Sequence, residues 1–301
     1  MIDEEGSFLG IVGDLDVTIG SDFKSGGTYE IEDISEEPYI VKYGQLRTIA
    51  DEQKSKDPNY FFSFIGIVEN LKNISWENLY KDLDNWKDGN INRYIPINEV
   101  KNWCKKNGLL WYEESIYHEY NKICMPLKEF YENAILLNIM FYLFHYINIS
   151  VMDSDSVQEN QLYKISKSNN SNFNIYDDDI RQYAVMLMKY CEFKNKPKGN
   201  KYFDVNSIFN MDINDVIMIG TNYCFDFINE MVNDIGLHFH RPRSYPYDKP
   251  DLFVYVQWPI NTLYYQFGMM LTKPEEVEGN IKRCENCNAY FWGRNMHCNS
   301  H

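Results

Sequence analysis

Basic residues are scarce in this chain, in which 29 Lys and Arg face 44 Asp and Glu for a net charge of −15. The deficit is uneven, because residues 1–40 hold eleven acids against one base, Lys24, and contribute −10. The rest is close to neutral for its length, so nucleic acid is not excluded as a partner. We interpret the acidic segment as a solubility device, with mimicry of an anion or a cover over a basic site as the alternative.

A secretory signal and a disulfide framework are also missing. The sequence starts with acids where a signal peptide needs a basic start, and the seven cysteines are an odd number. Four of them lie among apolar neighbours and are most simply small buried hydrophobic residues: Cys104, Cys124, Cys191 and Cys224. We therefore expect a cytoplasmic protein.

Residues 133–152 lack any charged side chain, and a helix of this length could cross a bilayer. Asn138, His145 and Asn148 lie within the segment, however, and would be costly in hydrocarbon. Basic flanks are absent as well. The pattern favours a central buried helix over a membrane span.

Several catalytic signatures are absent. The chain has no internal repeat, nucleotide fingerprint or Ser/His/Asp order, and Gly10-x2-Gly13 lacks the Lys of a phosphate loop. With 44% hydrophobic residues, the chain has ample material for a core.

The apolar spacing predicts a mainly α (α+β) protein. Asn98 is expected to cap a helix that ends at Asn107-Gly108. Residues 119–150 are expected to form one or two long helices, with Pro126 as a start or a kink. Spacings of three and four residues predict further helices from Asp177 or Asp178 to Cys191 and from Ile213 to Ile235, and Pro259 suits the first turn of another.

The composition suggests three regions. Residues 1–60 are acidic and partly β, residues 61–275 form a helical body, and residues 276–301 form a zinc knuckle. Within the body, residues 153–176 and 236–258 look like breaks.

The knuckle carries the most specific signal, Cys284-x2-Cys287-x10-Cys298-x2-His301. Three thiolates and one imidazole suit the tetrahedral site that Zn²⁺ prefers. His297 competes with His301 for the fourth position. A closed four-ligand site is structural, because a catalytic zinc keeps a position for water.

On these residues the chain resembles a group of uncharacterised bacterial proteins in which a helical body precedes a knuckle of the form Cys-x2-Cys-Gly-x-x-Phe, an Arg, and an aromatic-Cys-x2-3-Cys. The matching residues are Cys284, Cys287, Phe291, Arg294 and Cys298. The resemblance implies a treble-clef or zinc-ribbon site, and it suggests regulation or phage defence as the setting. Asn288 departs from the Gly of that pattern, His297 from its aromatic residue and His301 from its last Cys.

Residues 193–202 and residues 241–247 each combine cations with aromatic rings. This pattern suits binding of single-stranded nucleic acid. An ordinary solvated loop is the alternative for both. The cations, with the knuckle's arginine, are Lys194, Lys196, Lys198, Lys201, Arg241, Arg243 and Arg294. We expect a zinc-stabilised binding protein that contacts nucleic acid or a partner protein.

A nuclease is the competing function. Arg294-x6-His301 fits the loose Arg-x4-6-His spacing of HEPN ribonucleases, whose Arg and His act on a phosphodiester. A HEPN-like or metal-assisted nuclease would use Arg294 with His297 or His301.

Overall fold

A computed structural model gives the fold of the chain. It describes residues 16–19, 24–25, 27–43, 47–48, 58–69, 71, 75–85, 96–112, 116, 119–120, 122–152, 176–194, 205–232, 236–240, 251–256, 258–272, 281–283 and 290–292. This part of the chain is mostly helical and includes a small antiparallel sheet near the N-terminus. The expected mainly α class is confirmed at this level.

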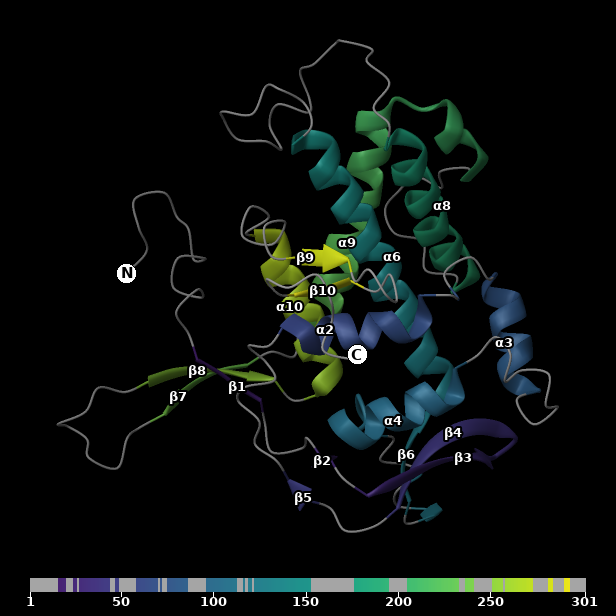
Figure 1. Cartoon of the computed structure of the whole chain (residues 1–301), viewed down its shortest axis with the longest axis vertical. Coiled ribbons are helices and arrows are strands. Elements are labelled where there is room, and N and C mark those ends of the chain that lie inside the picture. Colours follow the sequence, from purple (N-terminus) through teal and green to yellow (C-terminus); the bar gives the residue numbers. More distant parts are fainter. Residues whose placement is uncertain are drawn as a thin grey trace.

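Helix α6 (Leu127–Met152) runs through the middle of the molecule (Figure 1). It packs against α8 (Asp177–Phe193), α9 (Ile213–Val232) and α10 (Pro259–Thr272). A helix that is apolar on all sides must be covered on all sides, and here 72% of its most apolar window is buried. The prediction of a central buried helix is confirmed, since a membrane span would present that surface to lipid.

Helix α2 (Pro58–Ile65) continues into the short 3-10 helix η3 (Gly66–Val68) and lies across α6 and α10. Phe61 stacks on Phe267 of α10 with ring centroids 5.7 Å apart, and Phe64 meets Phe130 of α6 edge to face at 5.2 Å. Rings in these arrangements contribute beyond their buried area. The contacts fix α2 on the core.

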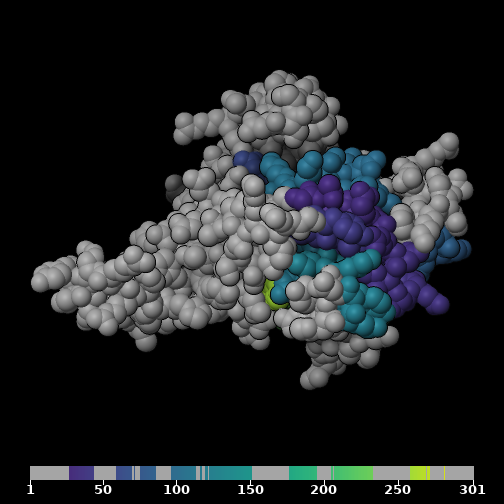
Figure 2. Space-filling view, turned by 90° about the horizontal axis from the view of Figure 1, so that it is seen from below, coloured from purple at the N-terminus to yellow at the C-terminus, as the bar shows by residue number. Residues whose placement is uncertain are grey.

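The N-terminal sheet has the strand order β3-β4-β6 and is antiparallel throughout. Strands β3 (Thr28–Ile34) and β4 (Glu37–Tyr43) are joined by Ser35 and Glu36, whose φ angles of 52° and 71° suit a tight hairpin turn. β4 packs on α6 and α3 (Trp76–Asp84), while β3 packs on α4 (Ile97–Asn107). Figure 2 shows the purple N-terminal strands at the molecular surface, next to blue and teal parts of the chain.

Strand β6 (Ile123–Pro126) leads directly into α6. The long helix starts directly after Pro126, as expected for one of the one or two helices over 119–150. The expectation is corrected before Pro126, because residues 123–126 pair with β4 as a strand. Pro126 ends the strand and precedes the helix, where its missing N–H removes no helical hydrogen bond.

A second sheet has the order β1-β8-β7. β1 (Asp16–Ile19) runs parallel to β8 (Asp251–Val256), which pairs antiparallel with β7 (Gly236–His240). The segment 236–258, expected as a break, thus supplies two strands. Both three-stranded sheets therefore combine strands from residues 1–60 with strands from the helical body. The short strands β2 (Lys24–Ser25) and β5 (Arg47–Thr48) pair with each other.

Three of the predicted helices agree closely with the structure. The residues expected on the inner face of α8, including Ala184 and Cys191, are buried, and so is the middle of the expected face of α9, including Phe227. Near the two ends of α9, Ile213 and Val232 are only partly buried. α4 ends where expected, with Gly108 at φ 88° as its C-cap. Its predicted start is wrong: Asn98 is not the cap, because the helix begins at Ile97, whose buried side chain draws the first turn onto the core.

Gly27 is needed at the start of β3. Its φ is +84°, and an added Cβ would lie 2.3 Å from the carbonyl oxygen of Tyr43. We expect Gly27→Ala to lower the free energy of unfolding by about 2 kcal/mol, measured by urea denaturation. Gly66→Ala is the matched control, because nothing lies within 4 Å of the position that its added Cβ would take. Equal stability of the two variants would contradict the argument.

Candidate functional site

The C-terminal metal motif is carried by a β-hairpin. β9 (Ile281–Arg283) pairs antiparallel with β10 (Tyr290–Trp292), with Arg283 opposite Tyr290. Cys284 directly follows β9, and Cys287 lies before β10. A paired hairpin brings the ends of its connection together, which suits a pair of ligands to one metal ion.

The hairpin is anchored to the helical body. β10 packs against α2, and Ile281 of β9 is buried in the main hydrophobic core (Figure 1). The four predicted ligands Cys284, Cys287, Cys298 and His301, and the alternative His297, lie outside the described residues. Within the described part of the chain, no cluster of three or more His, Cys, Asp or Glu side chains could hold a metal ion.

The other cysteines behave as small hydrophobic residues. Cys104, Cys124, Cys191 and Cys224 are buried, and none forms a disulfide. Burial raises the pKa of the Cys104 thiol, so it remains protonated and unreactive near neutral pH. This expectation from the sequence is confirmed.

Among the predicted nucleic-acid contacts, the structure describes Lys194 alone. Its ammonium lies 2.7 Å from the Glu132 carboxylate and 5.4 Å from the centre of the Tyr80 ring. Lys194 is thus already paired with protein groups. Lys196, Lys198, Lys201, Arg241, Arg243 and Arg294 lie outside the described residues.

Glu132 is the centre of a buried polar network. It projects from α6 and accepts hydrogen bonds from the hydroxyls of Tyr80 on α3 and Tyr190 on α8, in addition to its ion pair with Lys194. Burial, together with the Glu132 carboxylate, raises the pKa of both phenols above the usual range. They therefore stay protonated and donate to Glu132, which ties three helices together.

Beside this network lies a pocket of about 360 Å³, which we call the acidic pocket. Its polar wall is formed by α6, α9 and α10 through five side chains: Glu129, Glu132, Asn133, Glu230 and Asn261. The size falls within the range of small-molecule sites, roughly 300–1,000 Å³. The described residues that line the pocket include three Glu and no Lys, Arg or His.

Hydrogen bonds to other protein groups hold the side-chain amides of this wall in place. Asn133 donates to the backbone carbonyl of Glu129 at 2.8 Å and accepts from the Tyr264 hydroxyl at 3.1 Å. Asn261 donates to the carbonyl of Met231, while its buried Oδ1 has no hydrogen-bond partner among the described residues.

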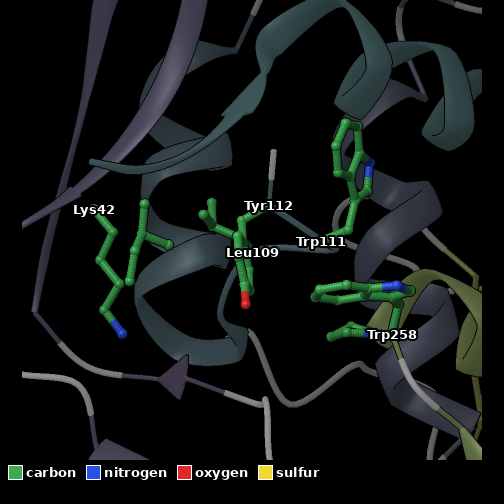
Figure 3. A pocket seen from close by; sticks show the side chains of 7 residues that line it. Lys42, Leu109, Trp111, Tyr112 and Trp258 are labelled. Carbon is green, nitrogen blue, oxygen red and sulfur yellow. The ribbon is translucent and has the colours of Figure 1, made fainter. Parts of the chain in front are cut away.

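Aromatic rings also line the acidic pocket. Trp111 and Trp258 line it together with a much smaller cavity, whose lining also includes Tyr112 (Figure 3). Tyr112 meets Trp258 edge to face with ring centroids 5.1 Å apart. Both indoles are only partly buried, so they remain accessible to a bound molecule.

The acidic pocket was not predicted from the sequence. Its one sequence signal is Glu132, the last charged residue before the uncharged segment 133–152. The partners of Glu132 are 52 and 58 residues away along the chain, so spacing could not identify them.

Comparison of the chain with known proteins found no similar protein. A scan against family models found no match, and neither curated proteins nor solved structures gave one. The candidate sites therefore rest on this chain's own residues.

Proposed function

We propose that this chain is a zinc-stabilised binding protein whose C-terminal knuckle presents basic and aromatic residues to single-stranded nucleic acid. The observation that carries the proposal is the paired β9–β10 hairpin, which is packed on α2 and flanks Cys284 and Cys287. A bacterial source, and regulation or phage defence as the setting, follow from the resemblance of the knuckle. The cytoplasm as the location follows from the cysteine usage.

The zinc ion would have a structural role, because it would stabilise the folded C-terminal region. Cys284, Cys287, Cys298 and His301 would complete a closed tetrahedral site, which joins the residues after β10 to the hairpin. Such a site supplies folding free energy because an unfolded chain does not hold the ligands together. Trp292 in β10 and Arg294 just after it would then be held at the surface for a ligand.

The nucleic-acid contact is proposed for the cations that have aromatic neighbours. These are Lys196, Lys198 and Lys201 beside Tyr202, and Arg241 and Arg243 beside Tyr245 and Tyr247. Cations would neutralise phosphates while rings stack on bases, an arrangement that tolerates any sequence. Lys194 is left out of this set, because its ammonium is paired with Glu132.

Metal analysis and a salt titration test the proposal together. We expect about one zinc ion per purified chain. Binding of single-stranded RNA or DNA in a shift assay should weaken with salt, and Lys196, Lys198 and Lys201 replaced together by Gln should reduce the log–log salt slope by about 2.

Lys105→Gln with Lys106→Gln is the control, since both lysines are exposed at the end of α4. A metal-free chain, or equal loss of binding in the two variants, would refute the proposal. Binding to a protein with no shift of nucleic acid would favour the partner-protein alternative. Cleavage of the RNA that Arg294→Ala abolishes would favour the nuclease.

A further inference from the structure

Two histidines share one face of the sheet β1-β8-β7. Residues of a strand alternate between the two faces of its sheet, so His238 and His240 of β7 lie on the same face. Leu237 and Phe239 lie on the opposite face. Imidazole is the commonest metal ligand in proteins, and a His-x-His pair on one strand places two imidazoles on one side of the sheet. A third ligand has to come from another segment.

The register of β7 and β8 brings a carboxylate to this pair. Asp251, the first residue of β8, is the direct partner of His240. Opposite residues of an antiparallel pair lie on the same face with Cβ atoms about 5 Å apart. Diagonal neighbours such as His238 and Asp251 are roughly 7–8 Å apart, which long side chains can span. Residues that are far apart along the chain thus meet on one patch of the sheet.

A second carboxylate belongs to the same face. Asp16 of β1 pairs with Phe253, and Phe253 pairs with His238 on its other side. Asp16 therefore lies one strand farther from the histidines than Asp251 does. A carboxylate at this place suits a hydrogen bond to a metal-bound water, a role that groups behind metal ligands commonly have.

The opposite face of the sheet specifies this register. It is apolar in all three strands, with the residues Val17, Ile19, Leu237, Phe239, Leu252, Val254 and Val256. A slip by one residue would move the apolar set of a strand to the other face, so the pattern opposes alternative pairings. β8 packs against α10, which gives the sheet one side toward the helical body (Figure 1).

The chemistry of the three ligands selects a class of metal ion. Two imidazoles and one carboxylate suit a divalent transition-metal ion such as Zn²⁺ or Fe²⁺, whereas Mg²⁺ and Ca²⁺ prefer oxygen ligands. Three protein ligands leave a position open for water or for an oxygen atom of a bound molecule. The structure describes β7 and β8 by their backbone pairing and not by their side chains, so these strands are outside the part of the chain in which three-ligand clusters are absent.

We propose that His238, His240 and Asp251 form a second metal site, for a divalent transition-metal ion, on the polar face of the sheet β1-β8-β7. The ion would also join the two ends of the connection 241–250, because His240 and Asp251 flank it. The site uses no residue of the zinc knuckle and none of the proposed nucleic-acid contacts, so it does not depend on the proposed function.

Equilibrium dialysis of the full, tag-free chain against micromolar Zn²⁺ tests the proposal. The wild-type chain should bind about one zinc ion more than the variant His238→Gln with His240→Gln, because that variant loses two of the three ligands. Any ion in the knuckle is counted equally in both chains, so the difference reports the second site alone. Circular dichroism confirms that each variant is folded, and His240→Gln alone replaces the double variant if that variant is not folded.

Carboxylate variants test the strand register. Asp251→Asn should lower the Zn²⁺ affinity of the second site at least about tenfold, because even groups behind metal ligands typically contribute roughly 10- to 100-fold. Asp234→Asn and Asp248→Asn are the matched controls and should leave the affinity unchanged. Both aspartates are closer to the histidine pair along the chain than Asp251 is, but neither belongs to the β7–β8 register.

The proposal is overturned if the histidine variant binds as much zinc as the wild-type chain, since His240 and Asp251 would then be an ordinary cross-strand pair. It is also overturned if either control variant weakens the site as much as Asp251→Asn does. Displacement of the zinc by Mg²⁺ at equal concentration would equally refute it, because the ligands would then be oxygen atoms and not imidazoles.

Discussion

Replacing Glu132 with leucine is expected to lower the free energy of unfolding by about 4 kcal/mol, because the change removes one partner from a buried polar network. The Glu132 side chain is only 10% exposed, and it pairs with Tyr80, Tyr190 and Lys194. Leucine would leave two phenol hydroxyls and an ammonium without their acceptor. Urea denaturation monitored by circular dichroism measures the loss.

A double-mutant cycle separates the network from simple packing. Tyr190→Phe alone should cost about 1 kcal/mol, and its combination with Glu132→Leu should cost less than the sum, because the orphaned hydroxyl is then absent. Glu192→Gln on the exposed face of α8 is the control and should change stability by less than about 0.5 kcal/mol. Strict additivity of the two network variants would show that Glu132 and Tyr190 do not interact.

Alkaline pH is expected to unfold the protein within about two pH units above 10. Burial raises the pKa of Tyr60, Tyr131, Tyr190 and Tyr264 in the folded chain above the ordinary value near 10. The unfolded chain therefore loses these protons first. Stability from these groups is fully present below pH of about 10 and is lost as the pH rises toward the folded-state values.

The size of the effect follows from the number of groups. Each such tyrosine removes about 1.4 kcal/mol of stability per pH unit above its unfolded pKa, and four of them together approach the whole stability of a typical domain, about 5–15 kcal/mol, near pH 12. Burial also raises the pKa of the Cys104 thiol, which acts in the same direction.

Tyr131→Phe isolates this contribution. The Tyr131 hydroxyl is buried and has no hydrogen-bond partner in the described part of the chain, so its removal should be neutral or stabilising at pH 7 and should make the alkaline transition less steep. Tyr120→Phe is the control, because the side chain of Tyr120 is 45% exposed. Circular dichroism and tyrosinate absorbance across the alkaline range provide the readout. Constant stability through pH 11 would show that the phenols are not buried as described.

Apolar spacing and helix-ending residues were sufficient to predict the helices in which the apolar pattern is sustained. In α8 and α9 the apolar residues recur every three or four positions, and most of the same residues are buried in the fold. Gly108 stops α4 because it adopts a positive φ at little steric cost. The cap of α4 was misplaced, because the burial of Ile97 outweighs the preference of Asn98 for the cap position.

Strands were harder to predict from the sequence than helices, because each strand pairs with a partner that is distant in sequence. The run Ile-Cys-Met-Pro of β6 is too short to distinguish helix from strand, and its pairing with β4 decides the outcome. β8 lies in a segment that looked like a break, yet it forms the middle of a sheet between β1 and β7.

The amino-acid sequence by itself determined the central helix, the faces that its neighbours bury, and the cysteine spacing that predicts a zinc knuckle, because each depends on residues close together in the chain. Only the tertiary structure decided that Glu132 joins three helices and that three glutamates, two amides and two indoles enclose one pocket. Those groups come from α3, α6, α8, α9, α10 and the segments before α10 and after α4, and no local rule fixes how such distant side chains meet.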